Sequence, residues 1–144
     1  MTHRNGFTIV ELLVVIVVIG ILATITIVAY SNIQLRARDT VRSSDIGSIQ
    51  KAIGLYYVDN GFYPLIGSPN SGNDIQALAT ALGVYSPAIP DDPRKGGPGI
   101  TNYQYVNSVG GGAYGIRISY EAKPQCKVLV NTTAAWWGTA TPVC

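Results

Sequence analysis

The sequence is poor in the residues that enzymes use to move protons or to hold metals. It contains one histidine, His3, near the start of the chain, and two cysteines, Cys126 and Cys144. Acid–base and nucleophilic relay chemistry most often uses an imidazole, and two cysteines without a nearby histidine are too few ligands for zinc. The sequence also has no phosphate-binding glycine loop. We therefore predict a protein that is not an enzyme, binds no metal and needs no cofactor.

Charged residues are also scarce, and the N-terminal part of the chain lacks proline. Charged residues make up 12% of the chain and the formal net charge is +2, which gives no strong attraction to nucleic acid. No charged residue lies between Glu11 and Arg36, and the first proline is Pro64. Because proline breaks helices, its absence permits one continuous helix from Phe7 to Tyr57, about 75 Å long at about 1.5 Å per residue.

The first half of this helix is apolar all round. The run from Leu12 to Tyr30 is long enough to cross the hydrocarbon core of a bilayer, which takes about 20 helical residues. Glu11 stands at its entrance, where a carboxylate costs about 2.5 to 3.5 kcal/mol on membrane-insertion scales. No basic residue of the chain lies within a helical turn or two of Glu11. We expect its countercharge to come from another molecule.

A short motif precedes the apolar run and carries a family resemblance. The segment Gly6-Phe7-Thr8-Ile9-Val10-Glu11, after a polar leader with Arg4, resembles the start of type IV pilins and of the pseudopilins of type II secretion and competence systems. The resemblance implies that a membrane aspartic peptidase, the prepilin peptidase, cuts between Gly6 and Phe7 and methylates the new amino terminus on Phe7. It also implies that Glu11 pairs with the terminal amine of a neighbouring subunit during assembly.

The resemblance implies a structural role and a set of partners. The chain would be the subunit of a type IV pilus, a homo-oligomeric helical filament with a core of bundled helices. The prepilin peptidase and the membrane would be direct partners, and an assembly ATPase and an inner-membrane platform protein indirect ones. Arg4 predicts a single-pass protein of the cytoplasmic membrane with a cytoplasmic amino terminus, which becomes part of a cell-surface pilus after assembly. A role in adhesion, twitching motility or DNA uptake is left open.

Three alternatives to a pilin stay open. A pseudopilin of a secretion or competence system would carry the same motif. A membrane protein with an extracellular binding head would keep Met1 and stay monomeric. An ordinary secretory signal would be cut near Ala29-Tyr30-Ser31 and release a chain that starts at Asn32, but its apolar region is usually only about 7 to 15 residues long.

The chain divides into a leader at 1–6, a transmembrane or filament-core half-helix at 7–30 and a head at 31–144. Within the first half-helix, Gly20 either loosens the helix or serves as a close-packing point. After Tyr30 the pattern becomes amphipathic, and the helix should end at Asp59-Asn60-Gly61. The expected apolar stripe consists of Ala37, Val41, Ile46, Ile49, Ile53, Tyr56 and Tyr57.

The sequence pattern in the rest of the head predicts a small sheet that packs on this stripe. The fold class expected from this arrangement is α+β. Asp74 can cap a short helix with Ile75, Leu78, Ala79 and Leu82 on one face, which Gly83 ends. Two strands alternate between apolar and polar residues, at 103–105 and 114–120, and Gly110-Gly111-Gly112 reverses the chain between them. The segment 127–130 can add a third strand.

The two cysteines predict a disulfide in an exported chain. A bond between Cys126 and Cys144 would close a loop of about twenty residues and stabilise the head by about 3 kcal/mol. The placement also resembles the disulfide-bounded C-terminal region of many type IV pilins, and it favours a pilin over a major pseudopilin, which generally lacks it.

Trp136-Trp137 would fill the core or form a glycan-binding patch, and we expect the core. Asn131-Thr132-Thr133 is a glycosylation acceptor only where the machinery exists.

Two charged groups in the head have a structural and a functional interpretation. Asp91-Asp92 would form a solvated turn or bind calcium as in major pseudopilins, and we expect the turn. Arg36, Arg38 and Arg42 would bind anionic lipid or DNA, or form a solvated or intersubunit face. Their spacing does not form one stripe, so we expect the latter.

Overall fold

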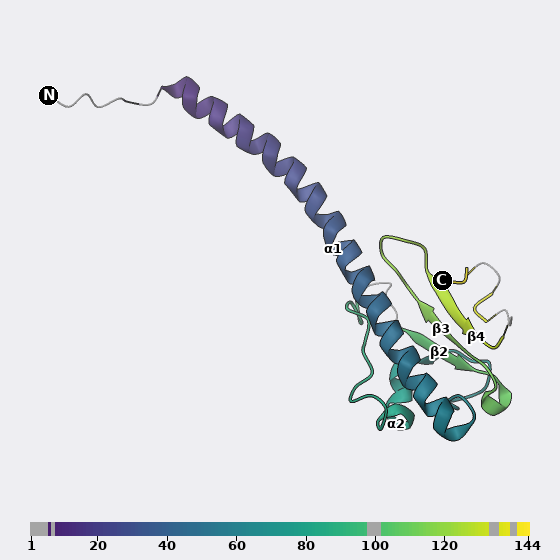
Figure 1. The fold of residues 1–144 in the computed structure, drawn as a ribbon. Helices are drawn as coiled ribbons and strands as arrows, with labels where there is room; N and C mark the ends of the chain where they lie inside the picture. Colours follow the sequence, from purple (N-terminus) through teal and green to yellow (C-terminus); the bar gives the residue numbers. More distant parts are fainter. Residues whose placement is uncertain (1–5, 7, 98–101, 133–135, 139–140) are drawn as a thin grey trace.

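One long helix carries a head on its C-terminal half in the computed structural model (Figure 1), which describes residues 6, 8–97, 102–132, 136–138 and 141–144. The helix α1 runs from Ile9 to Asn60 without a break, which confirms the continuous helix; Phe7, its expected start, lies outside the described residues. Gly61 ends it with a left-handed backbone of φ 77° and donates its N–H to the carbonyl of Tyr57. Glycine adopts this conformation without strain, which explains the stop.

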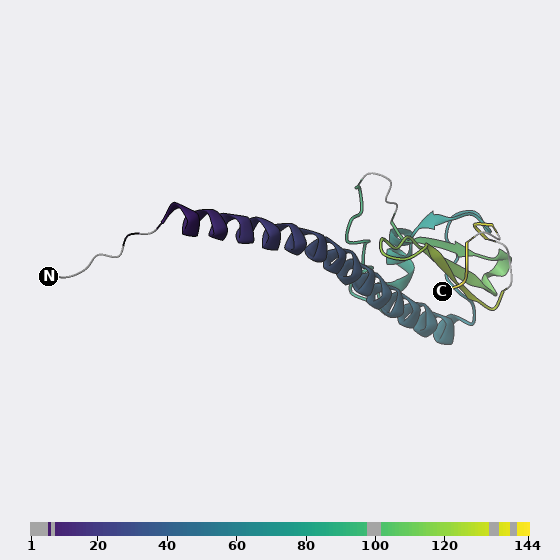
Figure 2. The same cartoon turned by 90° about the horizontal axis from the view of Figure 1, so that it is seen from above.

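The first half of α1 touches nothing else in the described chain. Figures 1 and 2 show it projecting beyond the head in both views, and its large apolar side chains are exposed from Ile9 to Ile27. It is long and apolar enough to cross a membrane. The helix stays regular through Gly20, and the hydroxyls of Thr24 and Thr26 donate to carbonyls of the preceding turn. The hydroxyls of Thr24 and Thr26 therefore do not oppose burial in lipid, and Glu11 is the charged side chain of this stretch.

The second half of α1 packs on the head through Ile46, Ile49, Ala52 and Ile53. The stripe expected from the sequence is wrong at its upper end. Ala37 and Val41 are exposed, whereas Asp39 and Arg42 are buried at 4% and 0% exposure. This part of the helix packs against loops and not against the sheet. These loops carry charged residues, and the helix presents complementary charges to them.

The head contains a four-stranded antiparallel sheet in the order β1-β2-β3-β4. Its strands are β1 (Asn73–Asp74), β2 (Gln104–Asn107), β3 (Tyr114–Ile118) and β4 (Cys126–Val130). The 3₁₀ turn η2 (Val109–Gly111) joins β2 to β3, as the three glycines predicted. Gly111 has φ 69°, and a Cβ there would lie 2.7 Å from the Tyr63 carbonyl oxygen, so a side chain does not fit.

The core lies between α1 and the facing side of the sheet. Tyr105, Tyr114, Ile116 and Ile118 from the sheet pack with α1 in one buried cluster. The 3₁₀ helix η1 (Ile75–Leu78) and the short helix α2 (Ala79–Leu82) add Ile75, Leu78 and Leu82, all at 0% exposure. The Asp74 side chain caps η1 by accepting from the Gln76 N–H, as expected, although Ala79 is exposed. The α+β fold class is confirmed.

The C-terminal segment lies against the other side of the sheet. Trp136 and Trp137 are half-buried and pack over Gly115, where an added Cβ would lie 3.0 Å from Trp136 Cε3 and 3.2 Å from Trp137 Cζ3. Their indole N–H groups donate to Asn70 and Gln104. The expectation that the pair fills the core is wrong, because the two rings lie away from α1 and cover the outer sheet face. Thr133 of the glycosylation triplet lies outside the described residues.

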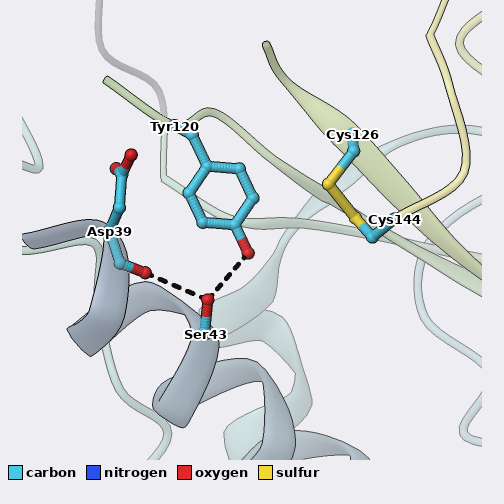
Figure 3. The surroundings of a disulfide bond; sticks show 5 residues. All are labelled: Asp39, Ser43, Tyr120, Cys126 and Cys144. Carbon is cyan, nitrogen blue, oxygen red and sulfur yellow. Dashed lines mark hydrogen bonds between the residues drawn. A yellow bond between two sulfur atoms is a disulfide. The ribbon is translucent and has the colours of Figure 1, made fainter. Parts of the chain in front are cut away.

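The last residues also run along strand β4. Lys127 donates its N–H to the Pro142 carbonyl and accepts from the Cys144 N–H, which makes a parallel bridge between Lys127 and Val143. The buried Lys127 ammonium donates to the carbonyls of Trp136 and Gly138. Cys126 and Cys144 form the predicted disulfide (Figure 3), which holds the tail on this strand.

Removal of this disulfide should cost the head about 3 kcal/mol of unfolding free energy, because its two cysteines lie 18 positions apart in the sequence. Cys144→Ser is the suitable variant, since Cys144 is exposed and Cys126 can remain as a small buried thiol. Chemical unfolding followed by tryptophan fluorescence measures the loss, and the reduced wild type should match the variant. Equal stability of the oxidised wild type and Cys144→Ser would contradict the prediction.

Candidate functional site

The motif at the start of α1 folds into a helix cap centred on Thr8 and Glu11. The Glu11 N–H donates to Thr8 Oγ1 at 3.2 Å, and Glu11 Oε2 accepts from both the Thr8 N–H and the Thr8 hydroxyl at 2.8 Å. This reciprocal arrangement is a capping box. The helix dipole also favours a carboxylate in the first turn.

The cap gives Glu11 neutral hydrogen-bond partners but no countercharge. No basic side chain in the described ranges forms an ion pair with it. The sequence interpretation recognised the missing charge and overlooked Thr8, although the spacing Thr-x-x-Glu before an apolar run is the signal for this cap. The carboxylate is therefore oriented and exposed, and it can accept a cation from outside the chain.

The expected cleavage position lies next to this cap. Gly6 is exposed and outside the helix, and Phe7 lies outside the described residues. Gly6, Thr8 and Glu11 thus occupy one exposed end of the molecule, far along α1 from the head (Figure 1). Cys126 and Cys144 lie in the head and do not belong to this site.

A second polar centre lies where α1 enters the head. Arg42 donates to both oxygens of Asp92 at 2.7 and 2.9 Å, to Asp39 at 2.7 Å and to Glu121 at 2.7 Å. Arg38 forms a two-bond pair with Glu121 at 2.8 and 2.7 Å, and Arg94 adds a further contact at 2.9 Å. Three arginines and three carboxylates therefore balance one another and join two loops to the helix.

This cluster corrects two expectations for charged residues. Asp92 is buried at 3% exposure and paired, so it is not part of a solvated turn, whereas Asp91 is exposed and paired with Lys95. Arg42 faces the interior instead of solvent or a neighbour; of the three arginines, Arg36 is exposed and Arg38 is half-buried. Among the described residues, no three carboxylate, cysteine or histidine side chains are grouped to hold a metal ion.

The pairing keeps the carboxyls of the cluster ionised. The Arg38 guanidinium, with Arg42 and Arg94, lowers the pKa of Glu121 far below its usual value against the opposing effect of burial. Burial alone would raise the pKa of Asp39, but the N–H groups of Glu121 and Ala122 and the Arg42 guanidinium outweigh it, and the net pKa is lowered. Both carboxyls thus bind protons more weakly in the folded chain than in the unfolded chain.

The stability of the head should therefore fall in acid. Because the folded pKa of Glu121 and of Asp39 is depressed, their stabilising contribution is complete above their unfolded pKa values, near pH 4, and is lost as the pH falls below them. Thermal unfolding of the full chain in detergent at pH 7, 5 and 3 measures this change. The melting temperature should hold between pH 7 and 5 and drop at pH 3, with a smaller drop for Glu121→Gln. An equal drop in both proteins would contradict the assignment.

Comparison with known proteins matches both the motif and the chain beyond it. Residues 1–27 match a family model described as the prokaryotic N-terminal methylation motif. The type II secretion system core protein G of Aeromonas hydrophila is 30% identical over 99 residues, which cover 63% of this chain and 68% of that protein. The type IV major pilin protein PilE1 of Neisseria gonorrhoeae is also 30% identical over 99 residues, covering 63% and 46%. No solved structure matches the chain.

These matches define one class of protein, in which a methylation motif leads into a long apolar helix. The chain belongs to the family of type IV pilins and type II secretion pseudopilins. The match to core protein G of Pseudomonas aeruginosa, 38% identical over 62 residues, spans only 44% of that protein, and the match to the Pectobacterium carotovorum protein spans 53%. Membership places the chain among proteins named as type IV pilins and type II secretion core proteins.

Proposed function

We propose that this chain is a pilin, the structural subunit of a type IV pilus. The observation that carries the proposal is the exposed Glu11 at the entrance of a bare apolar helix, hydrogen-bonded by Thr8 but without a countercharge among the described residues. The leader at 1–6 would be removed between Gly6 and Phe7, and Phe7 would be N-methylated by the prepilin peptidase. The segment 7–30 would then be the filament-core half of the helix, and 31–144 the head.

The new amine would supply the missing charge. In the bilayer, the capping box lowers the cost of the Glu11 carboxylate by giving it two hydrogen-bond donors. In the filament, the Phe7 amine of a neighbouring subunit would add the opposite charge in an apolar surrounding, where an ion pair repays its desolvation only if both charges are present. Exposed apolar side chains of α1 would exchange lipid contacts for contacts with neighbouring helices. This pairing would fix the axial register of the subunits.

The remaining assignments follow from this role. The chain would be stored as a single-pass protein of the cytoplasmic membrane with its amino terminus in the cytoplasm, and would reach the cell surface in the assembled pilus. An assembly ATPase and a platform protein would drive extraction, since the sequence has no nucleotide-binding loop.

A pseudopilin of a type II secretion system is the second candidate. It is favoured by the relatives named core protein G, whereas the disulfide-closed C-terminal segment favours a pilin. Shearing of cells distinguishes the two, because a pilin yields long surface fibres and a pseudopilin forms only short ones.

Mass spectrometry of the chain purified from its native membrane tests the proposal. We expect a protein that starts at an N-methylated Phe7 and lacks residues 1–6. A bitopic membrane protein with an extracellular binding head would instead keep Met1 and stay monomeric. Recovery of the intact, unmethylated chain from cells that contain a prepilin peptidase would contradict the proposal.

A further inference from the structure

Two cations near the charged cluster have no carboxylate partner among the residues that the structure describes. Arg38, Arg42 and Arg94 are all paired with acids. Arg36 is exposed and forms no ion pair within the described part of the chain, and the Lys123 ammonium contacts only the face of the Tyr120 ring, 4.1 Å from its centroid. Positive charge is thus available on one side of the upper head.

These two cations line the same pocket. It has a volume of about 310 Å³ and lies between α1 and the loop that follows β3. Its lining residues are Arg36, Asp39, Thr40, Ser43, Ala122 and Lys123.

The walls of this pocket are fixed by hydrogen bonds. The Asp39 carboxylate is occupied by Arg42 and by the N–H groups of Glu121 and Ala122, so its charge is already balanced. The hydroxyls of Ser43 and Tyr120 contact each other at 3.2 Å (Figure 3), which holds the loop that carries Lys123 against the helix. The pocket is therefore a formed, net positive recess rather than a gap between mobile segments.

The position of Arg36 along α1 places the membrane-side end of the pocket at the surface of a bilayer. If Glu11 marks one boundary of the hydrocarbon core, a span of about 20 residues ends near Ser31. Arg36 follows five residues later, about 7.5 Å further along the axis, whereas the headgroup layer is about 5 to 7.5 Å thick. The Cα–Cβ bonds of a helix tilt toward its N-terminus, which favours a path of the Arg36 side chain back toward the lipid.

We infer that this pocket docks the phosphate of an anionic phospholipid headgroup and so seats the head on the membrane while the subunit is stored there. Arg36 and Lys123 provide the charge, and Thr40, whose hydroxyl donates to the Arg36 carbonyl, forms part of the pocket wall. A lipid is favoured over a dissolved anion as the occupant because the apolar half of α1 holds Arg36, at the membrane-side end of the pocket, at headgroup height. The inference rests on the bilayer-stored state of the proposed function but not on filament assembly.

Lipid binding by the full chain in detergent micelles tests this site. Native mass spectrometry would count bound phosphatidylglycerol and, separately, phosphatidylcholine. The wild type should prefer phosphatidylglycerol, and each of Arg36→Gln and Lys123→Gln should weaken that binding about fivefold, since one cation near an anionic surface is worth about that factor. Lys51→Gln is the matched control, because Lys51 is an exposed cation lower on the same helix and outside the pocket, and its binding should equal that of the wild type.

Several results would overturn the inference. Unchanged phosphatidylglycerol binding by the double variant would exclude the pocket, and an equal loss in Lys51→Gln would show attraction to net charge alone. Displacement of the lipid by inorganic phosphate would indicate a dissolved-anion site, and an effect only on dimer content would indicate a contact between copies. If the full chain also fails to insert into vesicles, the proposed function fails with it; a chain that inserts without lipid preference contradicts this inference alone.

Discussion

Glu11→Ala should abolish fibre assembly while sparing membrane insertion and cleavage after Gly6. Removal of the carboxylate takes away an insertion cost of about 2.5 to 3.5 kcal/mol, so the variant should enter the bilayer at least as well as the wild type. It also leaves each neighbouring terminal amine without its partner, and breaking a buried ion pair costs about 3 to 5 kcal/mol. Since about 1.4 kcal/mol is a tenfold change in an equilibrium, sheared fibre yield should fall by at least about a hundredfold.

Glu11→Gln separates charge from capping in this experiment. The amide oxygen can still accept from the Thr8 N–H and hydroxyl, as Glu11 Oε2 does. If charge pairing drives assembly, the Gln variant should fail as the Ala variant does, whereas if the cap is what matters it should assemble. Immunoblots of sheared fibres and of membrane fractions, together with the mass of the processed chain, measure all three steps. Normal fibre yield from Glu11→Ala would refute the pairing role.

Arg42→Ala should be the most destabilising single substitution in the upper head. The side chain is at 0% exposure and contacts Asp39, Asp92 and Glu121. Its removal leaves these carboxylates without their shared cation, and breaking a buried ion pair in this way costs about 3 to 5 kcal/mol. Chemical unfolding followed by the fluorescence of the two tryptophans on the outer sheet face would measure the loss.

Two further variants test the reason for this loss. Arg42→Lys keeps the charge but replaces a planar fork with a single ammonium, which cannot bond three carboxylates in the same geometry, so its stability should lie between the wild type and Arg42→Ala. Lys51→Ala removes an exposed cation from the same helix and should change stability by less than about 0.5 kcal/mol. A loss of less than about 1 kcal/mol in Arg42→Ala would contradict a structural role for the cluster.

Features set by local chemistry could be predicted from the sequence. The absence of proline before Pro64 and the turn at Gly61 determine the extent of α1, and the alternation around Tyr105 and Ile116 identifies β2 and β3. The disulfide followed from having only two cysteines in an exported chain. Each of these depends on residues that are neighbours in sequence or on a pairing with no alternative.

Features set by contacts between distant segments could not be predicted. Arg42 lies 50 residues from Asp92 and 79 from Glu121, and nothing in the local pattern around these residues indicates that their loops meet. The helical period at Ala37 and Val41 suggested an apolar stripe, because a periodicity argument assumes that the buried face is apolar throughout. The Thr8 cap is different, since its spacing was visible and only its importance to Glu11 was overlooked.

The C-terminal tail, in which Val143 pairs with Lys127, affects how the edge of the sheet can contact other heads. β4 is the outermost strand on its side, and an open strand of this kind is a template for pairing with another sheet. Many heads held side by side along a fibre would be at very high local concentration, where such pairing leads toward amyloid-like stacking. Its own tail, held by the disulfide, occupies the backbone groups of Lys127, so this part of the β4 edge is not available to a neighbouring head.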